Sequence, residues 1–357
     1  MVVYVTPAEK NGGILQFSVM MLGETLKIQD AVLFVPNSVD SKYYEDLSDK
    51  IVLYEKTKTV NGRSKKIQDL AEAIMDKNPD RVVFLEDSLL MQQLNYILVK
   101  KGIKTAIVVH DVIHHPYRNM KLREILVEIM RQRWMKKTVR QQNSILLLSN
   151  NSKEIFDERH RKKKAKRVVM NLGAHVPNVT SERPKDFPQI NNYYLFFGRI
   201  DKYKGIADLC KAYTKLPVEL KDKHKLAIAG SGQFSDLEKS LIENDCNIIA
   251  LNRFIEDSEM VWLYEHAKVV VLPYIEASQS GVLPIAYHFS KPVIVSNQKG
   301  LLENIEKGKT GFSYRTHNEL VDCLTKMLAV DFSEEILSYY ERNFNWQKNI
   351  CRMLEEI

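Results

Sequence analysis

The stretch YYLFFGRIDKYKGI, residues 193–206, decides the fold and raises the first question about function. Tyr193 to Phe197 are continuously apolar and rich in aromatic residues, which is typical of a buried strand. The strand pattern stops at Gly198-Arg199, and Lys204-Gly205 then opens an amphipathic helix with Ile206, Leu209, Tyr213 and Leu216 on its apolar face. Ligands of doubly wound sheets bind beyond the carboxyl ends of the strands, so the two cations lie where an anion such as a pyrophosphate is expected. The alternative is that Arg199 and Lys204 are solvated surface charges.

Similar apolar runs alternate with helical patterns along nearly the whole chain. Short β-branched runs separated by helical segments predict βα units and parallel sheets. The expected strands are Val2–Val5, Ala31–Val35, Arg81–Leu85, Thr105–Val109, Ser144–Leu148, Val168–Met170, Tyr193–Phe197, Lys225–Ala229, Cys246–Ala250, Val269–Leu272 and Pro292–Val295.

The pattern predicts an α/β protein with two Rossmann-like, doubly wound domains that face each other across a cleft. The first domain is expected over residues 1–171, and a proline-containing linker with little periodicity over 172–192. The second domain is expected over residues 193–333. A C-terminal helical segment, 334–357, is expected to cross back over the outside of the domains.

Composition and charge exclude several classes of protein. Hydrophobic residues make up 45% and charged residues 27% of the 357 residues, as in ordinary globular proteins. No secretory leader and no apolar run long enough to span a membrane is visible, and the four scattered cysteines disfavour a disulfide framework or a zinc site. We therefore expect a cytoplasmic protein.

The basic charge is confined to one region. Residues 101–170 contain 18 lysines and arginines but 6 aspartates and glutamates, so with a net charge of +7 for the whole chain the remainder carries −5. Within this region, 118–140 has Leu122, Ile125, Leu126, Ile129, Met130 and Trp134 at helical spacing among many basic residues, and 159–167 reads RHRKKKAKR. Two interpretations stand: a solvated helix with a core-facing apolar stripe, or docking on an anionic membrane surface through 118–140 and 159–167. No nucleic-acid-binding motif accompanies the charge, so no nucleic acid is expected.

The loop after the strand VVVLPY carries small residues and one carboxylate. It reads Glu276-Ala-Ser-Gln-Ser280-Gly281-Val282-Leu283-Pro284. Small residues let a backbone approach a ligand closely, and Ser280 is expected to cap a helix that has Pro284 in its first turn. By itself this pattern indicates no more than a βα loop that can present N–H groups to an anion.

Four segments together resemble a known family. FFGRIDKYKGI, LAIAGSGQF, LNRFIEDSEMVWLYEHAKVVVLPYIEASQSG and KPVIVSNQKGLLENIEKGKTGF stand in the order and spacing of the retaining glycosyltransferases of family four, which have the GT-B fold. The resemblance implies that Arg199 and Lys204 bind the diphosphate of a nucleotide-sugar donor, such as a UDP- or GDP-hexose, and that Glu276 hydrogen-bonds the donor sugar. It also implies that Asn252–Ile255 (with Arg253, Phe254 and Ile255) contacts the base, and that the backbone of Gly281, Val282 and Leu283, next to Ser280, meets sugar and phosphate.

The chain departs from the family in one respect. The family has a second glutamate eight positions after the first, which binds the ribose, and that position here is Pro284. Either the ribose is bound differently in this chain or the donor preference differs.

The resemblance also gives roles to the first half of the chain. Gly12-Gly13 follows the first strand and, as an alternative to a plain turn, lets the N-terminal domain touch donor phosphate and acceptor. His110 follows another strand and is expected to point toward the reacting sugar, although a packed or surface histidine remains open. His110 and His114 have the spacing of metal ligands, but Pro116 and the strand context argue against a helical metal site.

The resulting expectation is a retaining hexosyltransferase that acts in bacterial surface-polysaccharide or glycolipid synthesis. No protein nucleophile and no hydrolase-like carboxylate pair is visible. By resemblance, the acceptor hydroxyl attacks from the front face, Arg199 and Lys204 stabilise the leaving diphosphate, and neither metal nor another cofactor is required. The acceptor is expected to be a saccharide, free or lipid-linked, and the protein to be cytoplasmic or peripheral on the inner face of the membrane. The rival hypotheses are a non-catalytic GT-B partner subunit and a GT-B nucleotide-sugar epimerase.

Overall fold

The computed structural model covers residues 1–357 and divides into two units. It describes all residues except 10–12, 57–64, 111, 113–121 and 162–163, and it describes residues 122–124 without their side chains. Unit 1 comprises Met1–Asn171 and Trp346–Ile357, and unit 2 comprises Leu172–Asn345.

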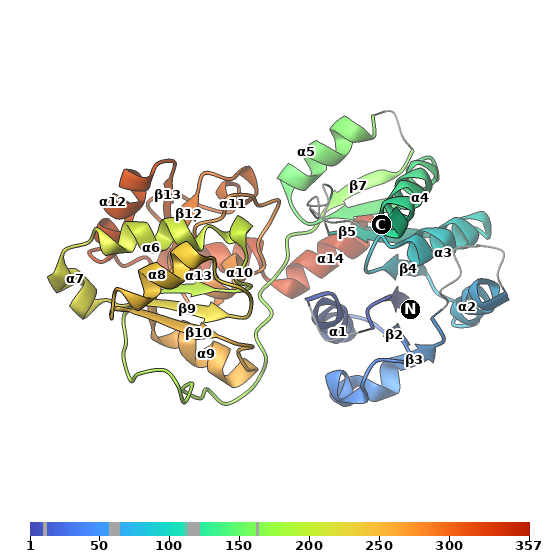
Figure 1. Ribbon diagram of the computed structural model, residues 1–357. Helices are drawn as coiled ribbons and strands as arrows, with labels where there is room; N and C mark the ends of the chain where they lie inside the picture. The colour runs from blue at the N-terminus through green and yellow to red at the C-terminus, as the bar shows by residue number, and fades with distance from the viewer. Residues whose placement is uncertain (10–12, 57–64, 111, 113–121, 162–163) are drawn as a thin grey trace. The chain divides into compact units, whose positions relative to one another are not determined.

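Unit 1 is a parallel seven-stranded sheet with helices on both faces (Figure 1). The strand order is β3-β2-β1-β4-β5-β6-β7. Its strands are β1 (Val2–Val5), β2 (Ala31–Pro36), β3 (Ile51–Tyr54), β4 (Arg81–Phe84), β5 (Thr105–Val109), β6 (Ser144–Leu147) and β7 (Lys166–Val169). Its helices are α1 (Gly13–Leu26), α2 (Lys65–Met75), α3 (Leu89–Lys100), α4 (Leu122–Thr138), α5 (Asn150–Arg159) and α14 (Trp346–Glu356).

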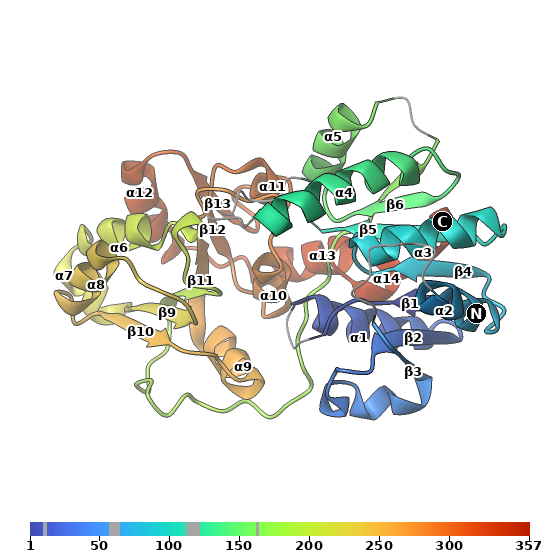
Figure 2. The same cartoon turned by 45° about the vertical axis from the view of Figure 1, so that its right-hand side comes forward.

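The order of strands in unit 1 reverses between β1 and β4. From β1 the chain proceeds outward to β2 and β3, and from β4 it proceeds in the opposite direction through β5 and β6 to β7. Right-handed crossovers then place the connecting helices of the two halves on opposite faces of the sheet. Helices α2, α3 and α4 pack in sequence against one another, as Figure 2 shows for α3 and α4, while α14 packs on α1 and beside β7.

Unit 2 repeats this architecture with six parallel strands in the order β10-β9-β8-β11-β12-β13. Its strands are β8 (Tyr193–Phe197), β9 (Leu226–Gly230), β10 (Ile248–Asn252), β11 (Ala267–Leu272), β12 (Val293–Ser296) and β13 (Gly311–Tyr314). Its helices are α6 (Ile206–Thr214), α7 (Val218–Lys223), α8 (Asp236–Glu243), α9 (Asp257–His266), α10 (Val282–His288), α11 (Lys299–Leu302), α12 (His317–Met327) and α13 (Ser333–Asn343). Helices α6 and α8 lie on one face of the sheet and α9 on the other (Figure 1).

The apolar strand runs form the centres of the two cores. Tyr193 to Phe196 are buried, as expected for a strand in a parallel sheet that is covered on both faces. The predicted apolar face of α6 is confirmed for Ile206, Leu209 and Tyr213, which are buried in the same core, and Leu216 is buried just beyond the end of the helix. The prediction of two doubly wound α/β domains is therefore confirmed.

Two strands were not expected from the sequence. β3 and β13 are the outermost strands of their sheets, and each has only two or fewer buried residues out of four. β13 reads GFSY and has no continuous apolar run, whereas β3 reads IVLY and was missed although it is apolar throughout.

Candidate functional site

The candidate anion site lies at the carboxyl ends of β8 and β11, the two strands between which the order of unit 2 reverses. Gly198-Arg199 directly follows β8, and the loop from Pro273 to Gly281 directly follows β11. A doubly wound sheet binds its ligand at this reversal because the connecting chains diverge there and leave the strand ends open. The topology therefore places the two segments selected from the sequence on neighbouring strand ends.

The two loops are in direct contact around Gly205. The N–H of Ile275 donates to the carbonyl of Tyr203 at 2.8 Å. Gly205 has a φ of +67°, and a Cβ atom there would lie 2.0 Å from the carbonyl oxygen of Pro273. Only glycine allows this left-handed turn and this close approach, so Gly205 holds Lys204 beside the loop that follows β11.

The ammonium group of Lys204 lies over an aromatic ring in this contact. Its Nζ is 3.6 Å from the centroid of Tyr274 and 4.9 Å from that of Tyr203. Burial lowers the pKa of Lys204 to about 8, and the positive charge of Arg199 contributes in the same direction, against the opposing effects of Tyr203 and Asp201. Burial and a second cation nearby both disfavour the charged form of Lys204, and a bound anion would stabilise that form.

The end of β8 that carries Arg199 is fixed by close backbone packing. A Cβ on Gly230 would lie 1.9 Å from the carbonyl oxygen of Gly198, so the ends of β8 and β9 approach as only glycine permits. The backbone of Arg199 is thus fixed, and its side chain is exposed.

The loop after β11 is anchored at both ends. Oγ of Ser280 accepts from the N–H of Val282 at 3.3 Å and lies 3.4 Å from the hydroxyl of Tyr274. The N-cap position of α10 is occupied by Gly281, so the prediction that Ser280 caps this helix is wrong. Leu283 is buried, whereas Gly281 and Glu276 are exposed. The exposed carboxylate of Glu276 therefore lies in the same short loop as Tyr274, whose ring contacts the ammonium group of Lys204.

The segment expected to contact a base contributes one exposed ring. The guanidinium of Arg253 is engaged by Asp186 at 2.6 Å and by Glu259 at 2.6 Å, and these hydrogen bonds raise its pKa. Ile255 is buried, while Phe254 is 58% exposed. In this structure Arg253 fixes the segment through ion pairs, and Phe254 presents its side chain to solvent.

In unit 1, His110 lies at the carboxyl end of β5. Its Nε2 is 2.8 Å from the carbonyl oxygen of Leu85, and its ring meets that of Phe17 edge to face at 5.3 Å. A carbonyl oxygen can only accept, so Nε2 carries a proton in this arrangement. Gly13 is the first residue of α1 and is exposed, whereas Gly12, like His114, lies outside the described residues.

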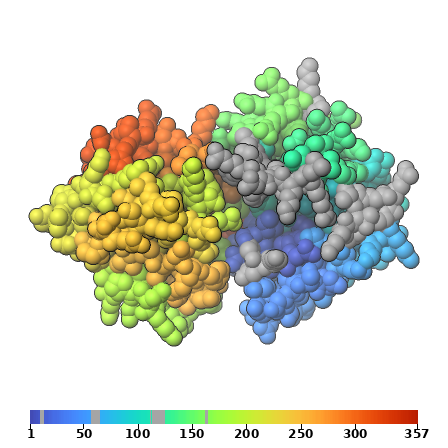
Figure 3. All heavy atoms as spheres, in the orientation of Figure 1, coloured from blue at the N-terminus to red at the C-terminus, as the bar shows by residue number. Residues whose placement is uncertain are grey.

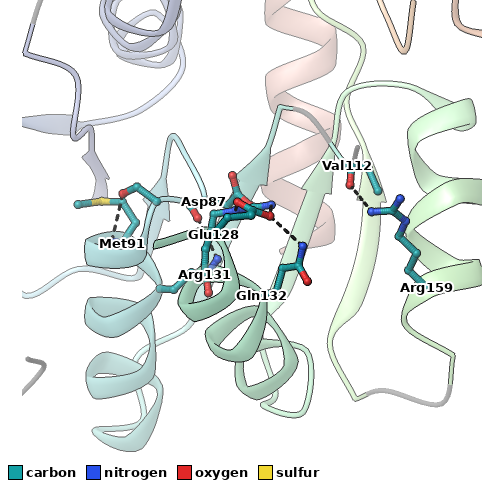
Figure 4. A network of polar contacts seen from close by, with 9 residues as sticks. Asp87, Met91, Val112, Glu128, Arg131, Gln132 and Arg159 are labelled. Atoms are coloured by element: carbon teal, nitrogen blue, oxygen red, sulfur yellow. Dashed lines mark hydrogen bonds and ion pairs between the residues drawn. The ribbon is translucent and has the colours of Figure 1, made fainter. Parts of the chain in front are cut away.

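Charged side chains gather where the strand order of unit 1 reverses. Asp87 follows β4 and is ion-paired with Arg131 of α4, which also binds Glu128 at 2.8 Å (Figure 4). Next to this network, burial raises the pKa of Glu86 to about 7, with a further contribution from the charge of Asp87. A carboxylate directly after a strand is the same positional signal that identifies Arg199, so Glu86 could have been selected from the sequence.

Helix α4 differs from one sequence interpretation. Ile125, Leu126, Val127 and Ile129 are exposed by 42%, 54%, 42% and 44%, so this part of the helix does not face the core. Figure 3 shows α4, in green, at the surface of unit 1. The interpretation of a core-facing apolar stripe is therefore wrong for Ile125, Leu126 and Ile129. Trp134, from the same expected stripe, does pack edge to face on Tyr96 of α3.

Among the residues that the structure describes, no group of three or more histidines, cysteines, aspartates or glutamates is arranged to hold a metal ion. No helix in this part of the chain combines the length and the apolar composition required to cross a membrane.

Solved structures of known proteins share the fold of this chain. The crystal structure of HepE from Anabaena in complex with UDP has a TM-score of 0.73 at 14% identity, covering 100% of both chains. The sucrose-phosphate synthase of Thermosynechococcus elongatus has a TM-score of 0.70 at 16% identity, covering 99% of this chain and 97% of that one. The fold is therefore that of GT-B glycosyltransferases.

The sequence match is confined to part of the chain. Residues 180–344 match the family model of glycosyl transferases group 1. Two uncharacterized glycosyltransferases of Methanocaldococcus jannaschii are 24% identical over 164 residues and 32% identical over 125 residues, which is 43% and 33% of this chain. The matches span 42% and 30% of those curated relatives, less than half their length.

Proposed function

We propose that this chain is a glycosyltransferase that moves a hexose from a nucleotide-sugar to an acceptor hydroxyl with retention of configuration. The observation that carries the proposal is the pair Arg199 and Lys204 at the strand-order reversal of unit 2. The family match over residues 180–344 supports the same reading. HepE, whose fold is similar, has been crystallised with UDP and with UDP-glucose, which supports a nucleotide-sugar as the donor.

In the proposed reaction the two cations act on the leaving group. The acceptor oxygen bonds to the anomeric carbon as the bond from that carbon to the diphosphate oxygen breaks, and the hydroxyl proton passes to the departing diphosphate. Charge accumulates on the diphosphate in the transition state, and a cation about 4 Å away contributes about 4 kcal/mol at an effective dielectric constant of about 20. Arg199 and Lys204 can supply this charge, so the proposed mechanism includes no divalent metal and no further cofactor.

The remaining donor contacts are assigned by resemblance and stay proposals. Glu276 is exposed in the loop after β11 and would hydrogen-bond the transferred sugar, and Phe254 would stack on the base. The backbone of Gly281 to Leu283 would meet sugar and phosphate. Gly13 and His110 of unit 1 would serve the donor phosphate and the reacting sugar, and a saccharide or lipid-linked saccharide of surface-polysaccharide synthesis would be the acceptor.

Calorimetry tests the donor site directly. UDP, GDP, ADP and dTDP, and their sugars, are titrated into the wild type with and without magnesium, and then into Arg199→Ala and Lys204→Met. We expect base-selective, magnesium-independent binding that weakens at least tenfold in each variant. Lys211→Ala is the matched control, because Lys211 is an exposed lysine at the opposite end of α6.

The same titrations separate the rival hypotheses. Unchanged affinity in both variants would refute the anion site. Binding without transfer or hydrolysis of any sugar would favour a non-catalytic subunit, and appearance of an epimerised nucleotide-sugar without acceptor would favour an epimerase.

We also propose that α4 docks on an anionic membrane surface. Arg133, Lys136 and Lys137 are exposed and follow Ile129 at spacings of 4, 7 and 8 residues, so they continue the side of the helix on which Ile129 lies. The outward side is apolar at its beginning and basic at its end, a combination suited to insertion beside lipid phosphates. The basic cluster at 159–167 adds to the positive charge of unit 1.

Vesicle sedimentation tests the docking proposal. The chain should bind phosphatidylcholine vesicles that contain phosphatidylglycerol better than pure phosphatidylcholine vesicles. Serine at 125, 126 and 129, or at 133, 136 and 137, should reduce that binding, whereas serine at the exposed Lys65 and Lys66 of α2 should not. Equal sedimentation of all variants would contradict the proposal.

A further inference from the structure

The loop after β11 contains a buried acceptor that the protein itself does not satisfy. Among the residues the structure describes, Oε1 of Gln279 is buried and has no hydrogen-bond partner. Leaving such an oxygen without a partner costs about 1–3 kcal/mol, so buried amide oxygens in proteins are nearly always bonded. A group that is absent from the protein chain is therefore expected at this oxygen when the protein works.

Gln279 lies in the loop that borders the two cations. The next residue, Ser280, contacts the hydroxyl of Tyr274 at 3.4 Å, and the ring of Tyr274 lies 3.6 Å from Nζ of Lys204. The unsatisfied oxygen thus belongs to the same short segment as the groups that carry the candidate anion site.

The loop cannot easily move to satisfy the oxygen by itself. A Cβ on Gly300 would lie 2.2 Å from the carbonyl oxygen of Ser278 and 2.7 Å from that of Ala277, so the chain at 277–278 is packed directly on the backbone of α11. In addition, Oγ of Ser296 donates to the carbonyl of Tyr274 at 2.5 Å. Both contacts lie before Gln279 in the chain, and after it the N–H of Val282 donates to Oγ of Ser280. The backbone around Gln279 is therefore held, while its half-buried side chain can rotate to bring the amide oxygen to a ligand.

The chemistry of the missing partner follows from the nature of the oxygen. An amide oxygen only accepts, so its partner must carry a hydrogen-bond donor. Ionised diphosphate oxygens have no proton to donate and are excluded. The hydroxyl groups of a ribose or of a transferred sugar are donors and belong to the ligand that would occupy this site.

We propose that the side chain of Gln279 accepts a hydrogen bond from a sugar hydroxyl of the nucleotide-sugar and so contributes to donor selectivity. The inference rests on the proposed function, because it requires a nucleotide-sugar at the strand-order reversal of unit 2, beyond the carboxyl ends of β8 and β11. It also gives the chain a side-chain contact to a sugar near Pro284, the buried proline of α10 that stands where the resembled family has its second glutamate.

The experiment compares the binding of three ligands to Gln279→Leu and to the wild type by calorimetry. Each ligand contains a diphosphate, and each adds further groups to the one before it. Inorganic pyrophosphate reports the cations alone, UDP adds the ribose together with the base, and UDP-glucose adds the transferred sugar. GDP and GDP-mannose form a second series that keeps the ribose and changes the base. In Gln279→Leu we expect unchanged pyrophosphate affinity and roughly three- to tenfold weaker binding of the sugar-bearing ligands, the usual loss for one neutral hydrogen bond. An equal weakening of UDP and GDP and of their sugars identifies the ribose, which both series share, and weakening of the nucleotide-sugars alone identifies the transferred sugar.

A second measurement separates a ligand contact from a structural one. Because leucine removes a buried oxygen that has no partner, the melting temperature of the ligand-free variant should be equal to or higher than that of the wild type. The matched control is Gln29→Leu, at an exposed glutamine beyond α1.

Three results would overturn the inference while leaving the donor site intact: unchanged affinity for every nucleotide, an equal loss for pyrophosphate, or a lower melting temperature. The first would mean that the oxygen accepts only from a buried water. Failure of the wild type to bind any of the probes would instead refute the proposed function.

Discussion

The lowered pKa of Lys204 predicts a pH dependence of nucleotide binding that can be worked out in advance. In the free protein this pKa is about 8, so a rise in pH from 7.5 to 9.5 removes most of the positive charge. A bound diphosphate favours the charged lysine and returns its pKa toward the ordinary value of about 10.4, so binding takes up a proton above pH 8. Affinity for UDP should therefore fall with rising pH, by roughly 20-fold or about 1.8 kcal/mol over these two units.

The assay is calorimetric titration of UDP at half-unit steps from pH 7.5 to 9.5, where the phosphates of the ligand are fully ionised. Lys204→Arg is the matched variant, because its guanidinium stays charged over the whole range and should remove the part of the pH dependence that Lys204 causes. A flat profile in the wild type would refute the reasoning, since it would mean that Lys204 has an ordinary pKa or does not face the ligand. An equal slope in Lys204→Arg would assign the titration to another group.

Three further substitutions test other parts of the structure. Gly205→Ala should destabilise the chain by at least about 2 kcal/mol in urea unfolding, because the new Cβ would collide with the carbonyl of Pro273 at a positive φ; a change below about 0.5 kcal/mol would contradict that geometry. His110→Ala should lower kcat more than it weakens donor binding, and full activity would show that the histidine only packs on its neighbours. Arg131→Met should destabilise by about 3–5 kcal/mol by leaving the buried carboxylate of Asp87 without its main partner, and an added Asp87→Asn should recover part of this loss.

Much of the fold was predictable from the sequence because central parallel strands are buried on both faces. The run at Tyr193–Phe197 is apolar throughout for that reason, and the strand and the helix after it lie as predicted. The four outermost strands lack this double burial: β7 and β10 were found from the sequence, whereas β3 and β13 were missed. Burial on both faces therefore explains why every central strand was found, but it does not separate the two edge strands that were found from the two that were missed.

The candidate site was predictable only in part, because sequence spacing does not show which side of a helix meets its neighbours. One interpretation of the sequence placed the apolar residues of α4 against the core. In the structure Ile125 and Ile129 are exposed to solvent, although α4 packs on α3. The ion pairs that occupy Arg253 involve Asp186, a residue 67 positions away, and Gln279 is recognisable only by a missing partner. Such properties arise from contacts between distant parts of the chain.

The return of the final helix to unit 1 has a consequence for biosynthesis. α14 packs on α1 and beside β7, and the amide of Asn349 donates to the carbonyl of Asn171 at 3.1 Å. Translation from the N-terminus therefore delivers all of unit 2 before it delivers the last piece of unit 1, so the first-made domain is the last to be completed. A nonsense codon or a protease cut near residue 345 would leave the second domain whole and strip the first of one of its covering helices.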